Sequence, residues 1–211
     1  MDTLIMMWAC MLFLILVAYI STRRLSLVPS GVQVACEFVV KGLYGFAESM
    51  IGAKSKPHVP LGASLFLFIL VANLCGQLPL RLFHLKEGEF ASPTNDINMT
   101  AALAVIVLVY YIVVGIKAKG FRFIYHGLSF NGIILTLVDL LEMITRPLSL
   151  AIRLYANILA GEILVSIVIG ACAYLAPVPV MLFEILVAFI QAIVFTMLTF
   201  SYISSSVNDE H

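Results

Sequence analysis

Six acidic or basic residues stand inside the two apolar segments that end this sequence, within residues 132–203. They are Asp139, Glu142, Arg146, Arg153, Glu162 and Glu184. An ionised side chain at the centre of a bilayer costs about 3 kcal/mol or more on insertion scales. Such residues usually mark an aqueous or ionic route through a membrane, and ion pairs that only support the structure are the alternative. We favour the ionic route.

The spacing of these groups along a helix predicts how they lie around Arg153. Each residue of an α-helix turns about 100° and rises about 1.5 Å, so Asn157 lies about 40° round from Arg153. Asp139 projects onto nearly the same side, about 21 Å away. Glu162 points about 180° away and lies about 14 Å along the axis in the other direction. Arg153 and Glu162 are therefore poor partners for an ion pair within one helix, and one carboxylate lies beyond each side of the guanidinium.

An arginine is a specific choice for such a place. Its guanidinium stays charged at essentially any pH, so it cannot carry a proton and can only attract, orient or block. A fixed cation suits a position that faces a mobile carboxylate on another protein, because it displaces the proton of that carboxylate as the two approach. A voltage sensor would repeat arginine at about every third position, whereas only Arg146 and Arg153 are present.

Polar and small side chains surround the charges. The neighbours that would let a second helix approach Arg153 closely are Ser149, Asn157, Ala160 and Gly161. Further on, Glu184 and Gln191 are seven residues apart and share a helix face, to which Tyr202 returns near the membrane edge. Asn157 and Gln191 have two compatible interpretations, as part of the ion pathway or as hydrogen-bonding partners between helices.

Composition requires a bilayer as the solvent of this chain. Of its 211 residues 62% are hydrophobic and 11% charged, with a formal net charge of +0 and a mean hydropathy of +1.08. This charge balance gives no basis for binding nucleic acid. The four cysteines form no CxxC pair, so the sequence indicates neither a structural zinc site nor a disulfide framework, and we expect no metal or cofactor.

The hydropathy pattern predicts an all-α membrane protein of about five to six hydrophobic helices in a single integral membrane domain, residues 1–211. We expect a span at 4–20, an interfacial helix at 30–52 in which Glu37 and Lys41 can pair, and spans at 61–82 and 99–116. Asn73 and Gln77 inside the second span need polar partners.

A C-terminal hairpin of two long, tilted helices completes the expected domain at 132–204. The part from 132 to 175 is too long for one upright crossing, so it must tilt, bend or break, and Pro147 offers a kink. Pro177 and Pro179 form a corner before a last apolar segment at 180–203. Basic residues gather on one side of the spans, which predicts an external N-terminus and a cytoplasmic C-terminus.

Four motifs resemble the subunit a family of F-type ATP synthases. R-P-L-S-L-A-I-R-L-Y-A-N-I-L-A-G-E at 146–162 is similar to the family signature, and N-L-C-G-Q-L-P at 73–79 to its second-span motif. S-P-T-N-D-I-N-M-T-A-A-L-A at 92–104 resembles its outer loop and third span, and I-Q-A-I-V-F-T-M-L-T-F-S-Y-I at 190–203 its final helix. The motifs occur in order over most of the chain.

The resemblance implies a stator subunit whose two long helices pack against a rotating ring of c subunits. Its other partners would be the b subunits of the peripheral stalk and the remainder of the F0F1 ATP synthase, in a bacterial inner membrane. Arg153 would be the essential arginine that faces the ring carboxylate between two offset proton half-channels. Further pathway positions would be Asn157, Glu162, Glu184, Gln191, Asp139, Ser149 and Tyr202.

The sequence departs from the family pattern at a few positions. Glu184 stands where many relatives carry a histidine opposite the acid at the position of Glu162, so two close carboxylates would titrate as a coupled pair. Tyr155 and Ala156 replace the commoner Phe and Gly, which alters packing rather than chemistry.

Several other functions remain as alternatives. A sodium-translocating version of the same subunit is one. A self-contained secondary transporter would show paired halves with matching interrupted helices, which are not evident. An intramembrane enzyme would need HExxH or a Ser or Cys nucleophile beside a His in the apolar core, and a scaffold would have no use for the buried charges. The sequence lacks the P-loop pattern GxxxxGK[ST], so we expect a non-catalytic channel subunit with nucleotide chemistry on its partners.

Overall fold

The computed structural model describes residues 2–23, 31–77, 94, 96–120, 130–171 and 177–208. These residues form six α-helices: α1 (Asp2–Arg23), α2 (Gly31–Ile51), α3 (Val59–Gln77), α4 (Ile97–Lys119), α5 (Phe130–Ala171) and α6 (Pro177–Val207). A short 3-10 helix, Gly52–Lys54, connects α2 to α3. Helices α1, α3, α4, α5 and α6 are long and apolar enough to cross a membrane, and α2 is not among these candidates. The predicted all-α membrane fold is confirmed.

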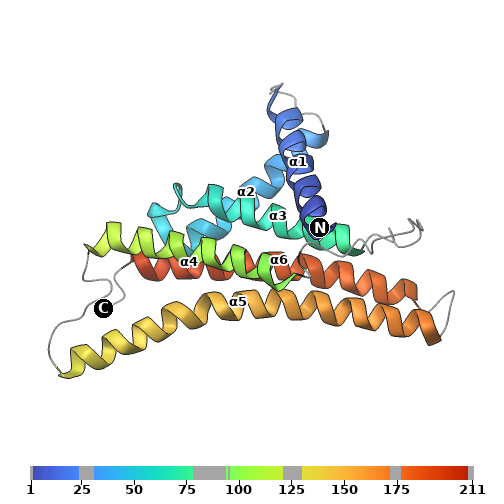
Figure 1. The fold of residues 1–211 in the computed structure, drawn as a ribbon. Coiled ribbons are helices and arrows are strands. Elements are labelled where there is room, and N and C mark those ends of the chain that lie inside the picture. Colours follow the sequence, from blue (N-terminus) through green and yellow to red (C-terminus); the bar gives the residue numbers. More distant parts are fainter. Residues whose placement is uncertain are drawn as a thin grey trace.

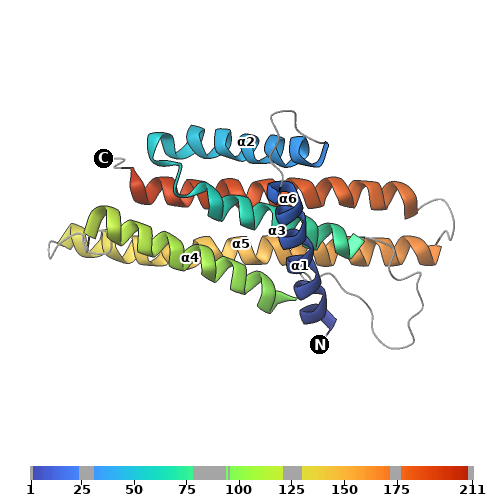
Figure 2. The ribbon, with the colours of Figure 1, turned by 90° about the horizontal axis from the view of Figure 1, so that it is seen from above.

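The two C-terminal helices form the base of the molecule. Helices α5 and α6 lie side by side, α4 packs along both, and α3 packs on α6 (Figures 1 and 2). Helix α1 stands steeply across the others in both views. Because α5 has 42 residues, its length is about 63 Å, roughly twice the thickness of the hydrocarbon core. Its candidate membrane span alone, Thr136–Val168, has 33 residues, about 50 Å, so an upright α5 would extend well beyond the hydrocarbon core.

Two prolines mark where the long helices differ from the sequence-based expectation. Helix α5 continues through Pro147 without ending, and it curves gently along its length in Figure 1. Helix α6 begins at Pro177 rather than at Val180, so the expected proline corner at 177–179 was wrong. A proline is well suited to the first turn of a helix, because the N–H it lacks would have no partner within the helix there.

Helix α4 has clear signals at both ends. The side chain of Asp96 accepts a hydrogen bond from the backbone N–H of Asn98 at 2.9 Å, which satisfies one of the N–H groups left open at the start of the helix. At the other end, Gly120 adopts φ 65°, a left-handed conformation that favours glycine. The sequence therefore fixes both ends of a span that lies against α5 and α6.

The core lies between α3, α4, α5 and α6. Ile69, Leu154 and Phe195 are fully buried, each with 0% of its surface exposed. A second cluster surrounds Phe200, and Gly62 of α3 allows the Phe200 ring to approach, because a Cβ at Gly62 would lie 2.2 Å from it. The α3–α6 contact is therefore one that only glycine permits.

Helix α2 carries the surface ion pair expected from its spacing. Lys41 Nζ lies 3.5 Å from the Glu37 carboxylate one turn earlier, which confirms the pairing. The hydrogen bond from the Gln33 amide is the largest cause that lowers the pKa of Glu37; desolvation opposes it, and the charge and hydrogen bond of Lys41 make smaller lowering contributions. The pair is exposed, so it contributes little to stability.

Candidate functional site

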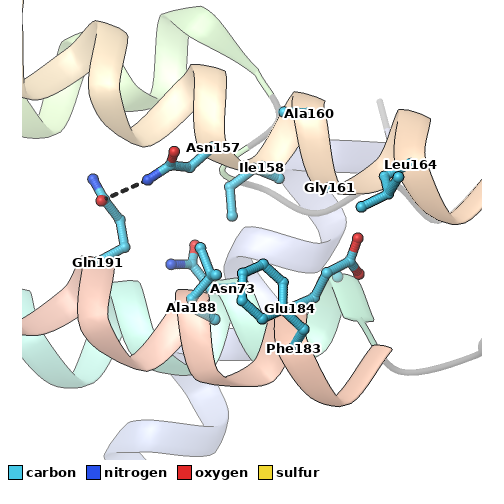
Figure 3. A pocket seen from close by; sticks show the side chains of 12 residues that line it. Asn73, Asn157, Ile158, Ala160, Gly161, Leu164, Phe183, Glu184, Ala188 and Gln191 are labelled. Atoms are coloured by element: carbon cyan, nitrogen blue, oxygen red, sulfur yellow. Dashed lines mark hydrogen bonds between the residues drawn. The ribbon is translucent and has the colours of Figure 1, made fainter. Parts of the chain in front are cut away.

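A cavity of about 230 Å³ lies where α5 and α6 face α3 (Figure 3). Most of its wall is apolar, but polar side chains enter it from all three helices. These are Asn73 from α3, Asn157 from α5, and Glu184 and Gln191 from α6. Asn157, Glu184 and Gln191, which the sequence analysis named as pathway residues, are thus brought together.

A hydrogen bond joins the two long helices at one end of this cavity. The side-chain amide of Asn157 donates to Gln191 Oε1 at 2.8 Å (Figure 3). The interpretation of these residues as interhelical partners is therefore confirmed. Gln191 is 3% exposed, and its Nε2 has no hydrogen-bond partner in the part of the chain that the structure describes. One amide group thus remains available to the cavity.

Asn73 was expected only to need a partner, and its position at the cavity was not foreseen. Its side chain is completely buried, and its Oδ1 accepts a hydrogen bond from the Thr94 hydroxyl at 2.8 Å. Among the described residues its Nδ2 finds no partner. The clue in the sequence was an amide in an apolar span, but spacing alone could not show which helices it would face.

Glu184 reaches the cavity beneath a glycine of α5. It is 8% exposed, and a Cβ built on Gly161 would lie 2.8 Å from Glu184 Oε1. Figure 3 shows the carboxylate directed toward α5 near Gly161. The absence of a side chain at Gly161 therefore makes room for the carboxylate. Glu162 is the next residue of α5, and its side chain lies outside the described residues, as does that of Asp139.

Arg153 lies near the middle of α5, within the candidate membrane span 136–168, and its side chain is exposed. No described residue forms a hydrogen bond or an ion pair with it. Ser149, Ala156 and Ala160 are also exposed, whereas Leu150 and Leu154 are buried against the bundle. Arg153 therefore lies on an exposed face of α5 composed partly of small residues, which permit close approach of another helix.

The cavity has the chemistry of a water-holding site rather than of a metal site. It is many times larger than the roughly 10–15 Å³ that one water requires, and it offers amide donors and a carboxylate as partners. Within the described ranges, no group of three or more His, Cys, Asp or Glu side chains is placed to hold a metal ion. Such an arrangement can conduct protons through water and a titratable carboxylate.

A second polar cluster surrounds Arg146, where α4 and α6 approach their C-terminal ends. The Arg146 guanidinium donates to the Glu142 carboxylate and to the Ser205 hydroxyl, the latter at 3.2 Å. Its carbon lies 5.8 Å from the ring centre of Tyr111 and 5.2 Å from that of Tyr202. Tyr202 is therefore far along α6 from the cavity and belongs to this cluster.

The sequence analysis did not identify the Arg146 cluster. The Glu142–Arg146 spacing of four residues was a readable signal of a helical ion pair. The two tyrosines were not readable in the same way, because each comes from a different helix. The space left between these side chains is only about 10 Å³. The cluster is therefore packed, in contrast to the cavity.

A third polar contact connects the start of α3 to α4. His58 is buried, and its Nδ1 lies 2.8 Å from the Tyr110 hydroxyl, with the two rings in an edge-to-face arrangement. Burial lowers the pKa of His58, because desolvation penalises the charged imidazolium. The neutral ring therefore suits this site.

Comparison with known proteins gives one consistent result. The profile of the family described as ATP synthase A chain matches residues 4–204. ATP synthase subunit a of Gloeobacter violaceus is 49% identical over 209 residues, covering 99% of this chain and 84% of the relative. Subunit a of Geobacter sulfurreducens is 36% identical, covering 100% of this chain and 89% of the relative. ATP synthase subunit a 1 of Pelobacter propionicus is 38% identical with the same coverage.

Proposed function

Because this chain belongs to the ATP synthase A chain family, we propose that it couples proton flow to rotation of a ring through Arg153. As a member of that family it is ATP synthase subunit a, a multi-pass, non-catalytic channel subunit of the F0 sector. The family match confirms the predicted membership of this family and the prediction that the chain is a non-catalytic subunit. We further propose that the ion is a proton, that Arg153 is the coupling residue, and that the partners are a ring of c subunits and the b subunits.

The observation that carries the proposal is the exposure of Arg153 in the middle of a membrane-length helix. A permanent cation at such a position is costly unless an anion or water meets it. The described part of this chain offers no such anion, so we infer that a partner supplies it. The partner we propose is a ring of c subunits, each with one carboxylate that passes Arg153. The b subunits of the peripheral stalk would hold the chain in place.

The travelling carboxylate changes its charge as the ring turns. Facing lipid it must be protonated, because a bare carboxylate in hydrocarbon is prohibitively costly. Beside Arg153 the ionised form is favoured, since an opposite charge stabilises it. A proton therefore leaves on one side of the arginine and another is taken up on the other side. The fixed charge of Arg153 prevents a direct passage between the two sides.

The cavity supports the assignment of the external half-channel. Glu184, Asn157 and Gln191 meet there, and the Asn157–Gln191 hydrogen bond lies one helical turn from Arg153. We propose that protons enter through water in this cavity and through Glu184, together with Glu162. Asp139 and Ser149 would belong to the cytoplasmic side, with the N-terminus outside and the C-terminus in the cytoplasm.

The test is Arg153→Ala in the assembled complex, in inverted membrane vesicles. We expect loss of ATP-driven proton pumping, because the ring carboxylate no longer meets a cation that displaces its proton. Lys117→Ala, which removes an exposed cation of α4, is the matched control and should pump normally. Normal pumping by Arg153→Ala, with the complex present in normal amount, would refute the role of Arg153.

A further inference from the structure

The Arg146 end of the α4–α5–α6 interface, which the proposed topology places toward the cytoplasm and which we call the inner end, leaves no room for a proton route between the helices. Arg146 fills it, lying between the rings of Tyr111 and Tyr202 and bonded to the Ser205 hydroxyl. Ser205 in turn donates to the backbone carbonyl of Tyr202 at 2.9 Å. Only about 10 Å³ remains between these groups, which is too little for a chain of waters.

The exposed face of α5 offers a polar route at the same membrane depth, in place of a route between the helices. Glu142, Arg146, Ser149 and Arg153 follow one another at spacings of four, three and four residues, which places them on one face of the helix. The side chain of Glu142 is 50% exposed and that of Arg146 28%. Arg153 and Ser149 are exposed too. A carboxylate that can exchange protons thus stands about 16 Å from Arg153 along the axis.

We propose that Glu142 is a proton-accepting carboxylate of the inner, cytoplasmic route, one helical turn closer to Arg153 than Asp139, and that Arg146, which lies against the rings of Tyr111 and Tyr202, is the positioning residue that holds it. This inference rests on the function proposed above. During ATP-driven pumping, the Glu142 carboxylate takes a proton from hydronium, which becomes water. The resulting carboxylic acid then gives the proton to water on the way to the ring carboxylate, and Glu142 returns to its ionised form.

The groups around Glu142 make this assignment specific. Among the described side chains, Arg146 is the charged group in contact with Glu142; one guanidinium nitrogen donates to Glu142 and the other to the Ser205 hydroxyl. Tyr111 from α4 and Tyr202 from α6 are the titratable side chains of the packed helices that face the pair through Arg146. Arginine suits this position, because its planar guanidinium can stack on two rings and still donate to a carboxylate.

The experiment measures ATP-driven proton uptake by inverted vesicles, whose medium contacts the cytoplasmic face of the assembled complex, as a function of medium pH. For Glu142→Gln we expect uptake to slow by about tenfold at neutral pH, equivalent to ~1.4 kcal/mol in the barrier. The rate should recover as the medium is acidified, because hydronium must then deliver protons directly. Glu48→Gln, which alters an exposed carboxylate of α2, is the control and should keep the original profile.

Two further variants separate positioning from folding. Glu142→Asp keeps a titratable group, so it should keep the original pH profile at a lower rate. This variant tests the role of Glu142 if the Glu142→Gln complex does not assemble. Arg146→Gln should reproduce the altered profile of Glu142→Gln, and Arg146→Lys should restore part of the original one.

The proposed role of Glu142 would be overturned if Glu142→Gln left the proton uptake rate and its pH profile unchanged. A Glu142→Asp variant with an altered pH profile would also overturn it. A normal profile in an assembled Arg146→Gln variant would overturn the positioning role. If Arg153→Ala pumps in the same assay, the proposed function falls. If Arg153→Ala fails to pump while Glu142→Gln behaves normally, only the present inference falls.

Discussion

The two halves of the α5–α6 interface are built in opposite ways. The half around Asn157 and Gln191 contains about 230 Å³ of space and amide groups with no partner among the described residues. The half around Arg146 leaves only about 10 Å³ and uses its cation in an ion pair, a hydrogen bond and two ring contacts. Arg153 lies between them on the exposed face of α5.

This difference shows how one interface can conduct on one side of an arginine and seal on the other. Polar groups that lack protein partners are costly when dry, so the cavity favours water. Satisfied polar groups in a packed cluster hold the helices in one arrangement. We therefore assign the loose half to conduction between the helices and the packed half to structure, with the inner route displaced to the face of α5.

The largest expected effect, and the strongest test of the difference between the two halves, comes from adding a side chain in the half that contains the cavity. In Gly161→Ala the new Cβ would lie 2.8 Å from Glu184 Oε1, so the carboxylate must move. We expect proton flux through F0 to fall by about tenfold, or ~1.4 kcal/mol in the barrier. Passive proton flux in vesicles stripped of the catalytic sector measures this effect.

A matched control for Gly161 lies on the same helix. A Cβ at Gly170 would meet no atom within 4 Å, so Gly170→Ala should conduct normally. Equal flux in the two variants would mean that the position of Glu184 beneath Gly161 has no role in the external half-channel.

The close α3–α6 contact, which like the Arg146 cluster is packed rather than open, should respond in stability rather than in conduction. In Gly62→Ala the Cβ would lie 2.2 Å from the Phe200 ring, which is held in the core cluster of α6. Overpacking of this kind typically costs about 1–3 kcal/mol. We expect a lower thermal unfolding temperature of the purified complex. Gly45→Ala, where a Cβ meets nothing within 4 Å, should not lower it, and a Gly62→Ala variant as stable as Gly45→Ala would contradict close packing here.

Much of this arrangement could be predicted from sequence. Long apolar runs gave the five membrane-length helices, and the motif from Arg146 to Glu162 indicated Arg153 and its family. The Asn157–Gln191 contact was among the interpretations, because amides in apolar helices seek partners across an interface. These features depend on local hydropathy and on residue types whose burial is costly.

The unpredicted features depend on contacts between distant segments. Nothing in the spacing of Tyr111 and Tyr202 indicated that both would stack on Arg146, and nothing paired Thr94 with Asn73. Helical periodicity gives the face on which a residue lies, but not which helix packs against that face. Proline at the start of α6 was also misread, because a corner and a first helical turn use the same residue for related reasons.

The smallest expected effect concerns pH at the packed end. Burial lowers the pKa of His58 below its ordinary value of 6.5, so the folded state binds this proton less readily than the unfolded state. Stability should therefore fall slightly as pH drops from 6.5 through the folded-state pKa, and be constant above 6.5 with respect to this group. Thermal unfolding at a series of pH values, compared with His58→Gln, checks this. An identical pH dependence in the two proteins would exclude a contribution from His58.

The most direct measurement of the central claim asks what lies against the Arg153 face of α5. A cysteine at Ala156, in a background without the four native cysteines, would carry a short photocrosslinker in the assembled complex. Because Ala156 is exposed one turn from Arg153, we predict a crosslink to the c subunit that stops ATP-driven rotation. Leu12→Cys on α1, which is also exposed, should give no such product. A position 156 that crosslinks only to lipid, with rotation unaffected, would contradict the account.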